Sequence, residues 1–262
     1  MSRNDGAIVL RCDAPGIPTD SSNLIVRAAS ALRDLVNKPI GVTIDLGKRI
    51  PAQGGLGGAS SNAAVTLLAL NRLWKVGLDK AQIQRLGERL GSDVPFFFAG
   101  GTGRANGTGT QVSPLPDGSE CFLIIITPNA RVSTSAAYDA LKAPSLTTQG
   151  SVSILSSSFA DHGFGDCDQW ALHNDFEGVI FEIEPEIERA KKALLEAGAQ
   201  GGLLTGSGSS VFGVFEGEAA RERGLTVLKR EAGWQIFPCK TISRCEYSEA
   251  FNSLGFPIQT LS

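Results

Sequence analysis

Apolar residues recur every three to four positions in some stretches of the chain and every second position in others. This change of period predicts a mixture of amphipathic helices and half-buried strands. Helical spacing predicts helices over residues 24–36, 60–74, 80–90, 185–198 and 218–231. Short apolar or alternating runs predict strands over residues 7–12, 41–46, 120–127, 211–215 and 234–242. The order of these elements indicates an α+β protein.

Two features of the pattern indicate how the chain is divided. Residues 143–169 are rich in Ser, Thr, Gly and Asp, and they predict a long connection with little regular structure. Glycines and polar residues also gather between Gly103 and Pro114. We place a boundary there between two α+β halves, residues 1–112 and residues 113–262.

A glycine-rich stretch at residues 48–64 is the most informative part of the sequence. Four glycines lie between residues 54 and 58, so backbone N–H groups can approach a bulky anion and positive φ costs little. Ser60 and Ser61 follow at the expected start of a helix, whose N-terminus favours negative charge. The stretch predicts a phosphate cradle, although it lacks the G-x-x-x-x-G-K-[ST] pattern of a P-loop. An ordinary glycine-rich turn is the alternative.

Two later stretches also carry chemically active side chains. Asp93 enters an apolar run at residues 92–98, where it either does chemistry or caps backbone N–H groups in a turn. Residues 204–210 form a second glycine–serine stretch, which is either part of a site or a tight turn between strands. Lys48 and Arg49 are either ligand contacts or, more commonly for such pairs, solvated charges.

Composition excludes several classes of function. The chain has 24 Lys and Arg, 27 Asp and Glu and a net charge of −3, so we expect no nucleic-acid partner and no membrane. Its longest apolar run, residues 121–126, is too short to cross a bilayer. The five cysteines show no C-x-x-C pattern and there are two histidines, so a zinc site is not expected. Reduced cysteines and a cytoplasmic location are the simplest interpretation.

Taken together, residues 48–64, 90–96 and 204–212 resemble the motifs of the GHMP kinase superfamily in order and spacing. The resemblance implies a two-domain fold: an N-terminal half like domain 2 of ribosomal protein S5 and a ferredoxin-like C-terminal half. Residues 20–29 and 173–177 resemble one branch of the superfamily. That branch uses ATP and Mg²⁺ to phosphorylate a hydroxyl of a cytidine-diphosphate-linked methylerythritol, in non-mevalonate isoprenoid precursor synthesis.

The resemblance also implies roles for individual residues. Asp93 falls on the catalytic aspartate, which deprotonates or orients the substrate hydroxyl. Thr134 and Tyr138 fall in the half that contacts the cytidine, on which Tyr138 can stack. The ATP-binding residues it implies, including two near the adenosine, are Pro51, Ala52, Gln53, Gly54, Gly55, Leu56, Gly57, Gly58, Ala59, Ser60, Ser61, Asn23 and Leu24.

The sequence departs from the family pattern in three places. Gln53 stands where a small residue is usual, and Ala59 replaces a frequent glycine, so both are expected to crowd the loop slightly. The Pro-Ala-Lys-x-Asn strand and the Gly-Tyr-His segment that open the family fold are not found, so the first strands are expected to be missing. The alternatives are an inactive nucleotide-binding remnant or a GHMP kinase for another alcohol. We expect a small-molecule substrate and a monomer or homodimer.

Overall fold

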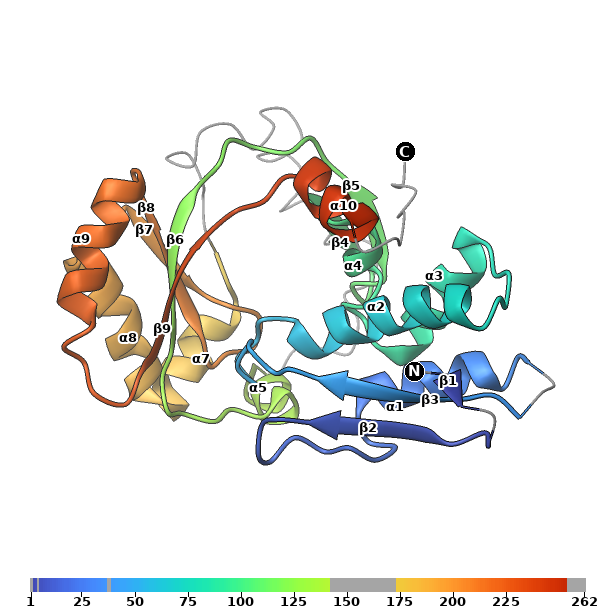
Figure 1. Ribbon diagram of the computed structural model, residues 1–262. Helices are drawn as coiled ribbons and strands as arrows, with labels where there is room; N and C mark the ends of the chain where they lie inside the picture. Colours follow the sequence, from blue (N-terminus) through green and yellow to red (C-terminus); the bar gives the residue numbers. More distant parts are fainter. Residues whose placement is uncertain (1, 4, 37–38, 142–172, 254–262) are drawn as a thin grey trace. The chain divides into compact units, whose positions relative to one another are not determined.

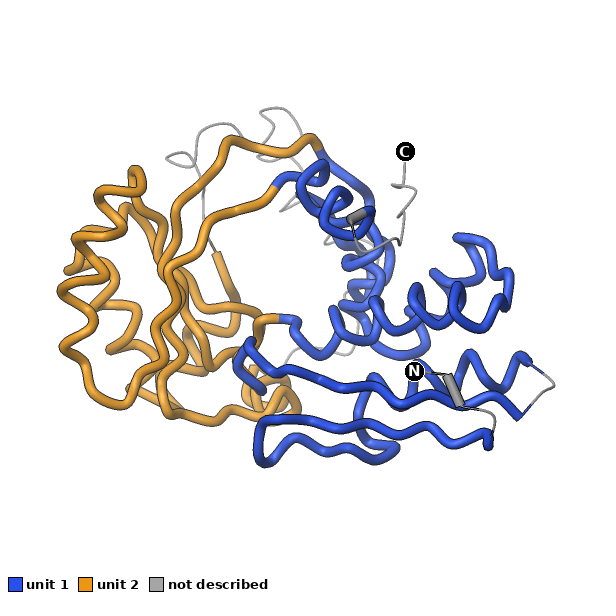
Figure 2. The backbone as a smooth tube through the Cα atoms, viewed as in Figure 1, with its two compact units in different colours: residues 1–52, 57–115, 243–262 blue, residues 53–56, 116–242 orange. Residues whose placement is uncertain are grey.

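The computed structural model describes residues 2–3, 5–36, 39–141 and 173–253. The chain forms two compact units, shown in different colours in Figure 2. Unit 1 comprises residues 1–52, 57–115 and 243–262, and unit 2 comprises residues 53–56 and 116–242. The irregular connection expected at residues 143–169 lies outside the described residues.

Unit 1 is built on a small mixed sheet with the order β1-β3-β2. Strands β2 (Ile8–Cys12) and β3 (Gly41–Leu46) are parallel, and α1 (Leu24–Arg33) connects them in the sequence. Strand β1 (Ser2–Arg3) pairs with β3 in the antiparallel direction. The patterns that predicted β2, α1 and β3 are confirmed, whereas β1 is too short to give a periodic signal.

Three further helices complete the core of unit 1: α2 (Gly58–Leu73), α3 (Lys80–Leu90) and the single turn α4 (Phe96–Ala99). Helix α2 packs against α1, α3 and α4. The buried cluster that joins these elements to the sheet comprises Ala28, Ala29, Leu32, Val42, Ala63, Ala64, Leu67, Leu70, Trp74, Ile83, Leu86, Val94 and Phe98. The members of this cluster on α1, α2 and α3 are apolar positions of the helical patterns, so these predicted faces are buried.

The C-terminal helix α10 (Arg244–Ser253) belongs to unit 1, together with the hairpin of β4 (Gly103–Asn106) and β5 (Gln111–Pro114). Arg244 Nη2 donates to the carbonyl of Thr102 at 2.6 Å. The hydroxyl of Tyr247 donates to the carbonyl of Phe97 at 2.7 Å. Burial raises the pKa of Tyr247 to about 12, so this hydroxyl keeps its proton at neutral pH and remains a donor.

Unit 2 contains a four-stranded antiparallel sheet with the order β7-β8-β6-β9. Its strands are β6 (Phe122–Thr127), β7 (Gly201–Leu204), β8 (Val211–Phe215) and β9 (Gln235–Lys240). Helix α8 (Pro185–Glu196) lies between β6 and β7 in the sequence, and α9 (Glu218–Leu228) lies between β8 and β9. Figure 1 shows both helices on one face of this sheet. This order and layering confirm the expected ferredoxin-like half.

The core of unit 2 lies between that face and its helices. The fully buried side chains include Ile124 and Ile126 from β6 and Leu194 from α8. Two more helices, α5 (Thr134–Leu141) and α7 (Phe176–Ile183), extend the same cluster. Neither helix is among those that the apolar period of the sequence predicted.

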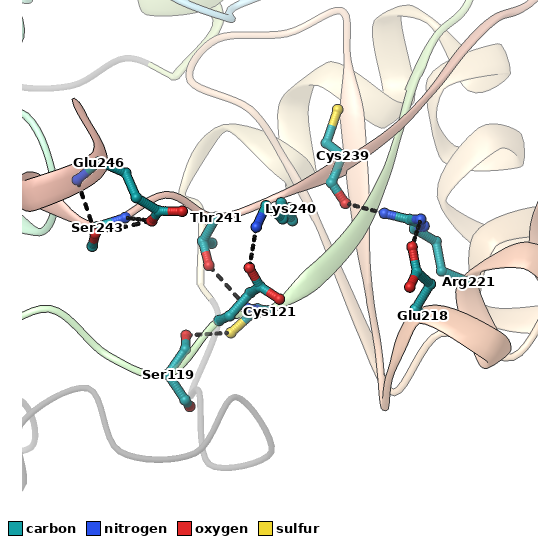
Figure 3. Close-up of polar contacts among 10 residues, drawn as sticks. Ser119, Cys121, Glu218, Arg221, Cys239, Lys240, Thr241, Ser243 and Glu246 are labelled. Carbon is teal, nitrogen blue, oxygen red and sulfur yellow. Dashed lines mark hydrogen bonds and ion pairs between the residues drawn. The ribbon is translucent and has the colours of Figure 1, made fainter. Parts of the chain in front are cut away.

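Polar contacts fasten the far end of this sheet (Figure 3). Thr241 and Cys121 exchange two hydrogen bonds of 2.9 Å, one through the Thr241 hydroxyl and one between backbone groups. Arg221 on α9 donates to the carbonyl of Cys239 on β9 at 3.0 Å and pairs with Glu218. These bonds hold α9 and the β6–β9 pair together away from the glycine–serine stretch.

The cysteines only partly match the expectation from the sequence. Cys12, Cys239 and Cys245 are free thiols. Cys121 is disulfide-bonded, so the expectation that all cysteines are reduced is not met at this position. Within the described ranges, no helix combines the length and the apolar composition needed to cross a membrane.

The capping box of α3 provides a test of how unit 1 is stabilised. Asp79 accepts from the Gln82 backbone at 2.8 Å, and the Gln82 side chain accepts from the Asp79 backbone at 2.9 Å. Because loss of such a cap leaves helix N–H groups without partners, Asp79→Ala should lower the free energy of unfolding by about 1 kcal/mol. Urea unfolding followed by far-ultraviolet circular dichroism measures this. Arg85→Ala, at an exposed position of the same helix, is the control, and equal stability of the two variants would contradict the capping argument.

Candidate functional site

The first turn of α2 presents unpaired backbone donors. The helix begins at Gly58, two residues before the expected start at Ser60, and its N-cap Gly57 has a left-handed φ of 66°. No side chain caps this end, and the Ser61 N–H is the first to bond back, to the carbonyl of Gly57 at 2.9 Å. The N–H groups of Gly58, Ala59 and Ser60 therefore remain available to an anion. They lie at the N-terminus of a 16-residue helix, which carries a partial positive charge.

Neighbouring side chains keep this backbone bare. A methyl group on Gly57 would lie 2.8 Å from Cζ of Phe97, which is closer than carbon atoms approach. A methyl group on Gly58 would lie 3.1 Å from the side chain of Ile50 and 3.2 Å from Nζ of Lys48. Glycine is therefore required at Gly57, and it leaves the narrow space over Gly58 open.

The other half of the glycine loop, residues 53–56, belongs to unit 2 and is held there by the second glycine–serine stretch. The carbonyl of Gly54 accepts from Thr205 Oγ1 at 2.8 Å and from the Ser210 N–H at 3.1 Å. The Ser210 hydroxyl in turn bonds Thr127 Oγ1 at 2.7 Å, and both of these side chains are buried. Residues 204–210 thus form a tight strand–strand turn, and the same turn fixes the loop.

The contact between the loop and this turn leaves no room for side chains on the glycines. A methyl group on Gly55 would lie 2.1 Å from the carbonyl oxygen of Thr205, and Gly55 also has a φ of 71°. A methyl group on Gly54 would lie 2.6 Å from the Ser210 hydroxyl. Only glycine fits either position.

The two departures from the family pattern within the glycine loop have different consequences. Gln53 adopts a φ of 59°, a left-handed conformation that is unfavourable for any residue with a Cβ atom. Its side chain is exposed, so the penalty lies in the backbone conformation. Ala59 is an exposed residue in the first turn of a regular helix. The expected crowding is therefore replaced by backbone strain at one position.

A second set of polar groups supports the turn at residues 204–210. The amide of Asn174 donates to the carbonyls of Leu204 and Gly206 at 2.9 and 2.8 Å. Glu177 accepts from the Leu204 N–H at 2.9 Å and forms an ion pair with Lys191 at 2.7 Å. The motif at residues 173–177 therefore acts on the turn that holds the loop, and Asn174 also accepts from the backbone at the start of α7.

Asp93 lies in the turn between α3 and α4. Its neighbour Val94 is fully buried and Phe98 almost so, and these anchors hold the segment while the Asp93 side chain stays exposed. The capping alternative is not supported, because no hydrogen bond or ion pair joins the Asp93 carboxylate to any described residue. Phe97, four residues later, packs on Gly57. The segment that carries Asp93 therefore lies against the start of α2.

Asn23 and Leu24 mark the start of α1. The Asn23 side chain accepts from the Ile25 N–H at 2.9 Å and donates to the carbonyl of Pro18 at 2.7 Å. Leu24 packs against the core of unit 1. The structure accounts for both residues as a helix cap and its neighbour, and their expected role near the adenosine stays a prediction.

Thr134 and Tyr138 lie on α5 in unit 2. Tyr138 is 56% exposed and meets Phe176 edge to face, with ring centroids 5.0 Å apart. The Thr134 hydroxyl accepts from Ser207 Oγ at 3.3 Å, which connects α5 to the glycine–serine turn. An exposed aromatic face beside polar hydroxyl groups is a surface on which a planar base can stack.

Comparison with known proteins identifies the family. The model of the GHMP kinase N-terminal domain matches residues 23–101, and the model of the C-terminal domain matches residues 160–233. A 4-diphosphocytidyl-2-C-methyl-D-erythritol kinase from Syntrophus aciditrophicus is 37% identical over 235 residues, which cover 90% of this chain and 82% of that protein. The chain belongs to the GHMP kinase family.

Solved structures place this GHMP kinase in the same fold. A crystal structure of 4-(cytidine 5'-diphospho)-2C-methyl-D-erythritol kinase matches with a TM-score of 0.69 and 30% identity, over 93% of this chain and 85% of that one. Homoserine kinase from Cytophaga hutchinsonii matches with a TM-score of 0.64 and 21% identity, over 90% and 82%, which shows a shared fold only. The chain is therefore an ATP-dependent small-molecule kinase with the two-domain GHMP fold.

The structure of this kinase also shows residues that sequence reasoning did not assign. Thr205, Ser210 and Thr127 hold the glycine loop. The sequence singles out the stretch that contains Thr205 and Ser210, but it does not indicate that this stretch bonds to the glycine loop, and it does not single out Thr127. Their bonds join segments far apart in the chain, for which a local pattern has no signal.

Gly55 and Gly107 form a matched pair for testing the contact between the loop and the turn. Both have positive φ, but a methyl group on Gly107 would meet nothing within 4 Å. Gly107→Ala should therefore carry only the backbone penalty, about 1 kcal/mol, and keep wild-type ATP affinity. Gly55→Ala must displace the loop from Thr205, so it should weaken ATP binding by at least tenfold. Calorimetric titration with ATP measures this, and equal affinities would show that the contact does not shape the ATP site.

Proposed function

We propose that this kinase transfers the γ-phosphoryl group of ATP to a hydroxyl of 4-diphosphocytidyl-2-C-methyl-D-erythritol, a step of non-mevalonate isoprenoid precursor synthesis. The supporting observation is the 37% identity to a kinase of that name over 90% of this chain. Solved kinases for other alcohols resemble the chain at 21% identity or less, which supports a common fold but no common substrate.

In this proposal the ATP phosphates lie along residues 51–61. The bare glycine backbone and the open amides at the start of α2 fit a phosphate chain. Backbone donors that are already fixed need no rearrangement when charge develops on the transferred group, so they stabilise the transition state effectively. Asn23 and Leu24 would lie near the adenosine.

Asp93 would act on the substrate hydroxyl. As the hydroxyl oxygen bonds to the γ-phosphorus, the bond to the bridging oxygen breaks, ADP leaves, and the hydroxyl proton passes to the Asp93 carboxylate. The support is that this carboxylate is exposed and engaged with no other described residue, so it is available to accept that proton. Phosphoryl transfer depends mainly on positioning and charge stabilisation, so a backbone cradle, Mg²⁺ and one aspartate can supply most of the catalysis.

We propose that Mg²⁺ arrives bound to the ATP phosphates. No group of three or more His, Cys, Asp and Glu side chains is placed to hold a metal ion in the described ranges. Mg²⁺ commonly keeps several waters and takes one or two carboxylates plus substrate phosphates, so a dedicated protein cage is not required.

The remaining parts of the proposal follow from the same assignment. We place the ATP-binding domain at residues 1–112 and the substrate-side domain at residues 113–262. The enzyme would act in the cytoplasm on a small molecule, as a monomer or homodimer. Sedimentation of the purified protein tests the last point, and fractionation of the source cells tests the location.

The direct test of the reaction is incubation of the protein with ATP, Mg²⁺ and each of three alcohols: the cytidine-linked methylerythritol, homoserine and mevalonate. We expect phosphorylation of the first alone and inhibition by CMP, because only that substrate carries a cytidine. Turnover of homoserine or mevalonate without inhibition by CMP would reassign the substrate.

The proton-accepting role predicts the effect of Asp93→Asn, which keeps the size of the side chain but removes its basicity. Turnover should fall by about 10²–10⁴ while ATP affinity stays within a factor of about two. Steady-state kinetics and calorimetry measure the two quantities, with Ser92→Ala as a neighbouring control. Near-normal turnover of Asp93→Asn would remove Asp93 from this role.

The exposed ring of Tyr138 predicts that its removal affects KM for the cytidine-linked substrate but not KM for ATP. Tyr138→Ala should raise KM for the cytidine-linked substrate by about tenfold or more, because stacking on a base is lost. KM for ATP should not change, and Tyr138→Phe should retain wild-type kinetics because it keeps the ring. Equal KM values for wild type and Tyr138→Ala would place the cytidine elsewhere.

A further inference from the structure

Lys48 is held firmly at the start of the glycine-rich stretch. It follows β3 after a single glycine, and its backbone N–H donates to Oδ1 of Asp13 at 2.9 Å. Asp13 in turn follows β2, the parallel neighbour of β3. The backbone of Lys48 is therefore fixed to the sheet of unit 1, and its side chain leaves from a defined point.

The side chain runs to the first turn of α2. Its Nζ atom lies 3.2 Å from the position that a methyl group on Gly58 would occupy, next to the side chain of Ile50. Lys48 is partly buried, and its ammonium group has neither a hydrogen bond nor an ion pair with any residue that the structure describes. Partial burial removes some of the water that would otherwise solvate the charge, and no side chain that the structure describes replaces that water.

The position of the Lys48 ammonium is electrostatically unfavourable when no anion is bound. The N-terminus of α2 carries a partial positive charge, and the ammonium lies against it. Burial lowers the pKa of Lys48 from its ordinary value of 10.5. Asp13 engages the backbone N–H of Lys48 rather than its ammonium. An anion at the first turn of α2 would remove both penalties at once.

We infer that the Lys48 ammonium binds a phosphate of ATP at the first turn of α2, beside the open amides of Gly58 and its neighbours. This inference rests on the proposed ATP site and adds a side-chain cation to a cradle otherwise made of backbone. The adjacent Arg49 is exposed, so it represents the solvated charge that Lys48 would otherwise be.

Calorimetric titrations of four proteins with ATP and with adenosine test the inference. The proteins are wild type, Lys48→Met, Lys48→Arg and Arg49→Met. Methionine keeps most of the apolar stem and removes the charge, and Arg49→Met makes the same change of charge one residue away. Lys48→Met should weaken ATP binding by about tenfold or more and leave adenosine binding unchanged, because adenosine has no phosphate. Lys48→Arg should retain most of the affinity, and Arg49→Met should match wild type.

The outcomes separate this inference from the proposed function. If wild type binds ATP and Lys48→Met loses no more affinity than Arg49→Met, the inference is wrong and the ATP site stands. If wild type does not bind ATP, the proposed function is wrong, and the inference fails with it.

Two further measurements test the inference without measuring enzyme turnover. The pH dependence of Lys48 acylation, followed by mass spectrometry on wild type, should show a higher pKa with ATP than with adenosine; equal values would overturn the inference.

Because folding lowers the pKa of Lys48, the charged ammonium destabilises the folded state at neutral pH, and this destabilisation disappears as the pH rises through 10.5. Lys48→Met should therefore melt no lower than wild type at pH 7, whereas a structural role predicts a lower melting temperature.

Discussion

The contact between Gly54–Gly55 and the turn at residues 204–210 fixes the conformation of the glycine loop, on which the proposed phosphate site depends. One carbonyl, that of Gly54, accepts hydrogen bonds from both Thr205 and Ser210. The approach is so close that neither glycine can carry a side chain. A loop held in this way presents its backbone in one conformation, which is what a site for a polyphosphate requires.

Several conspicuous motifs of the sequence support this contact through hydrogen bonds. Asn174 and Glu177 bond the strand end at Leu204, and Thr127 bonds Ser210. The chain continues from this loop into α2, in unit 1. There the ring of Phe97 leaves no room for a side chain at Gly57, and the carbonyl of Phe97 accepts a hydrogen bond from the Tyr247 hydroxyl. Some residues of the conspicuous motifs therefore hold the glycine loop in place. Substituting them should change ligand binding by changing the conformation of that loop.

The sequence predicted those parts of the structure whose signals are local. The long apolar periods of α1, α2 and α8 and the apolar run of β6 lie where expected, since a helix face or a buried strand is encoded within a dozen residues. The bonds from Thr205 to Gly54, 151 positions apart, and the return of α10 to unit 1 depend on contacts between distant segments. The position of the Lys48 ammonium likewise depends on where β3 and α2 lie, so its sequence is equally consistent with a solvated charge.

The central claim is that the first turn of α2 receives the phosphates of ATP. Residue-resolved amide hydrogen exchange with and without ATP tests it most directly, because the N–H groups of Gly58, Ala59 and Ser60 have no acceptor within the helix. We predict that saturating ATP slows the exchange of these amides by about tenfold or more and that adenosine leaves them unchanged. Equal exchange rates at these amides with and without bound ATP would contradict the account.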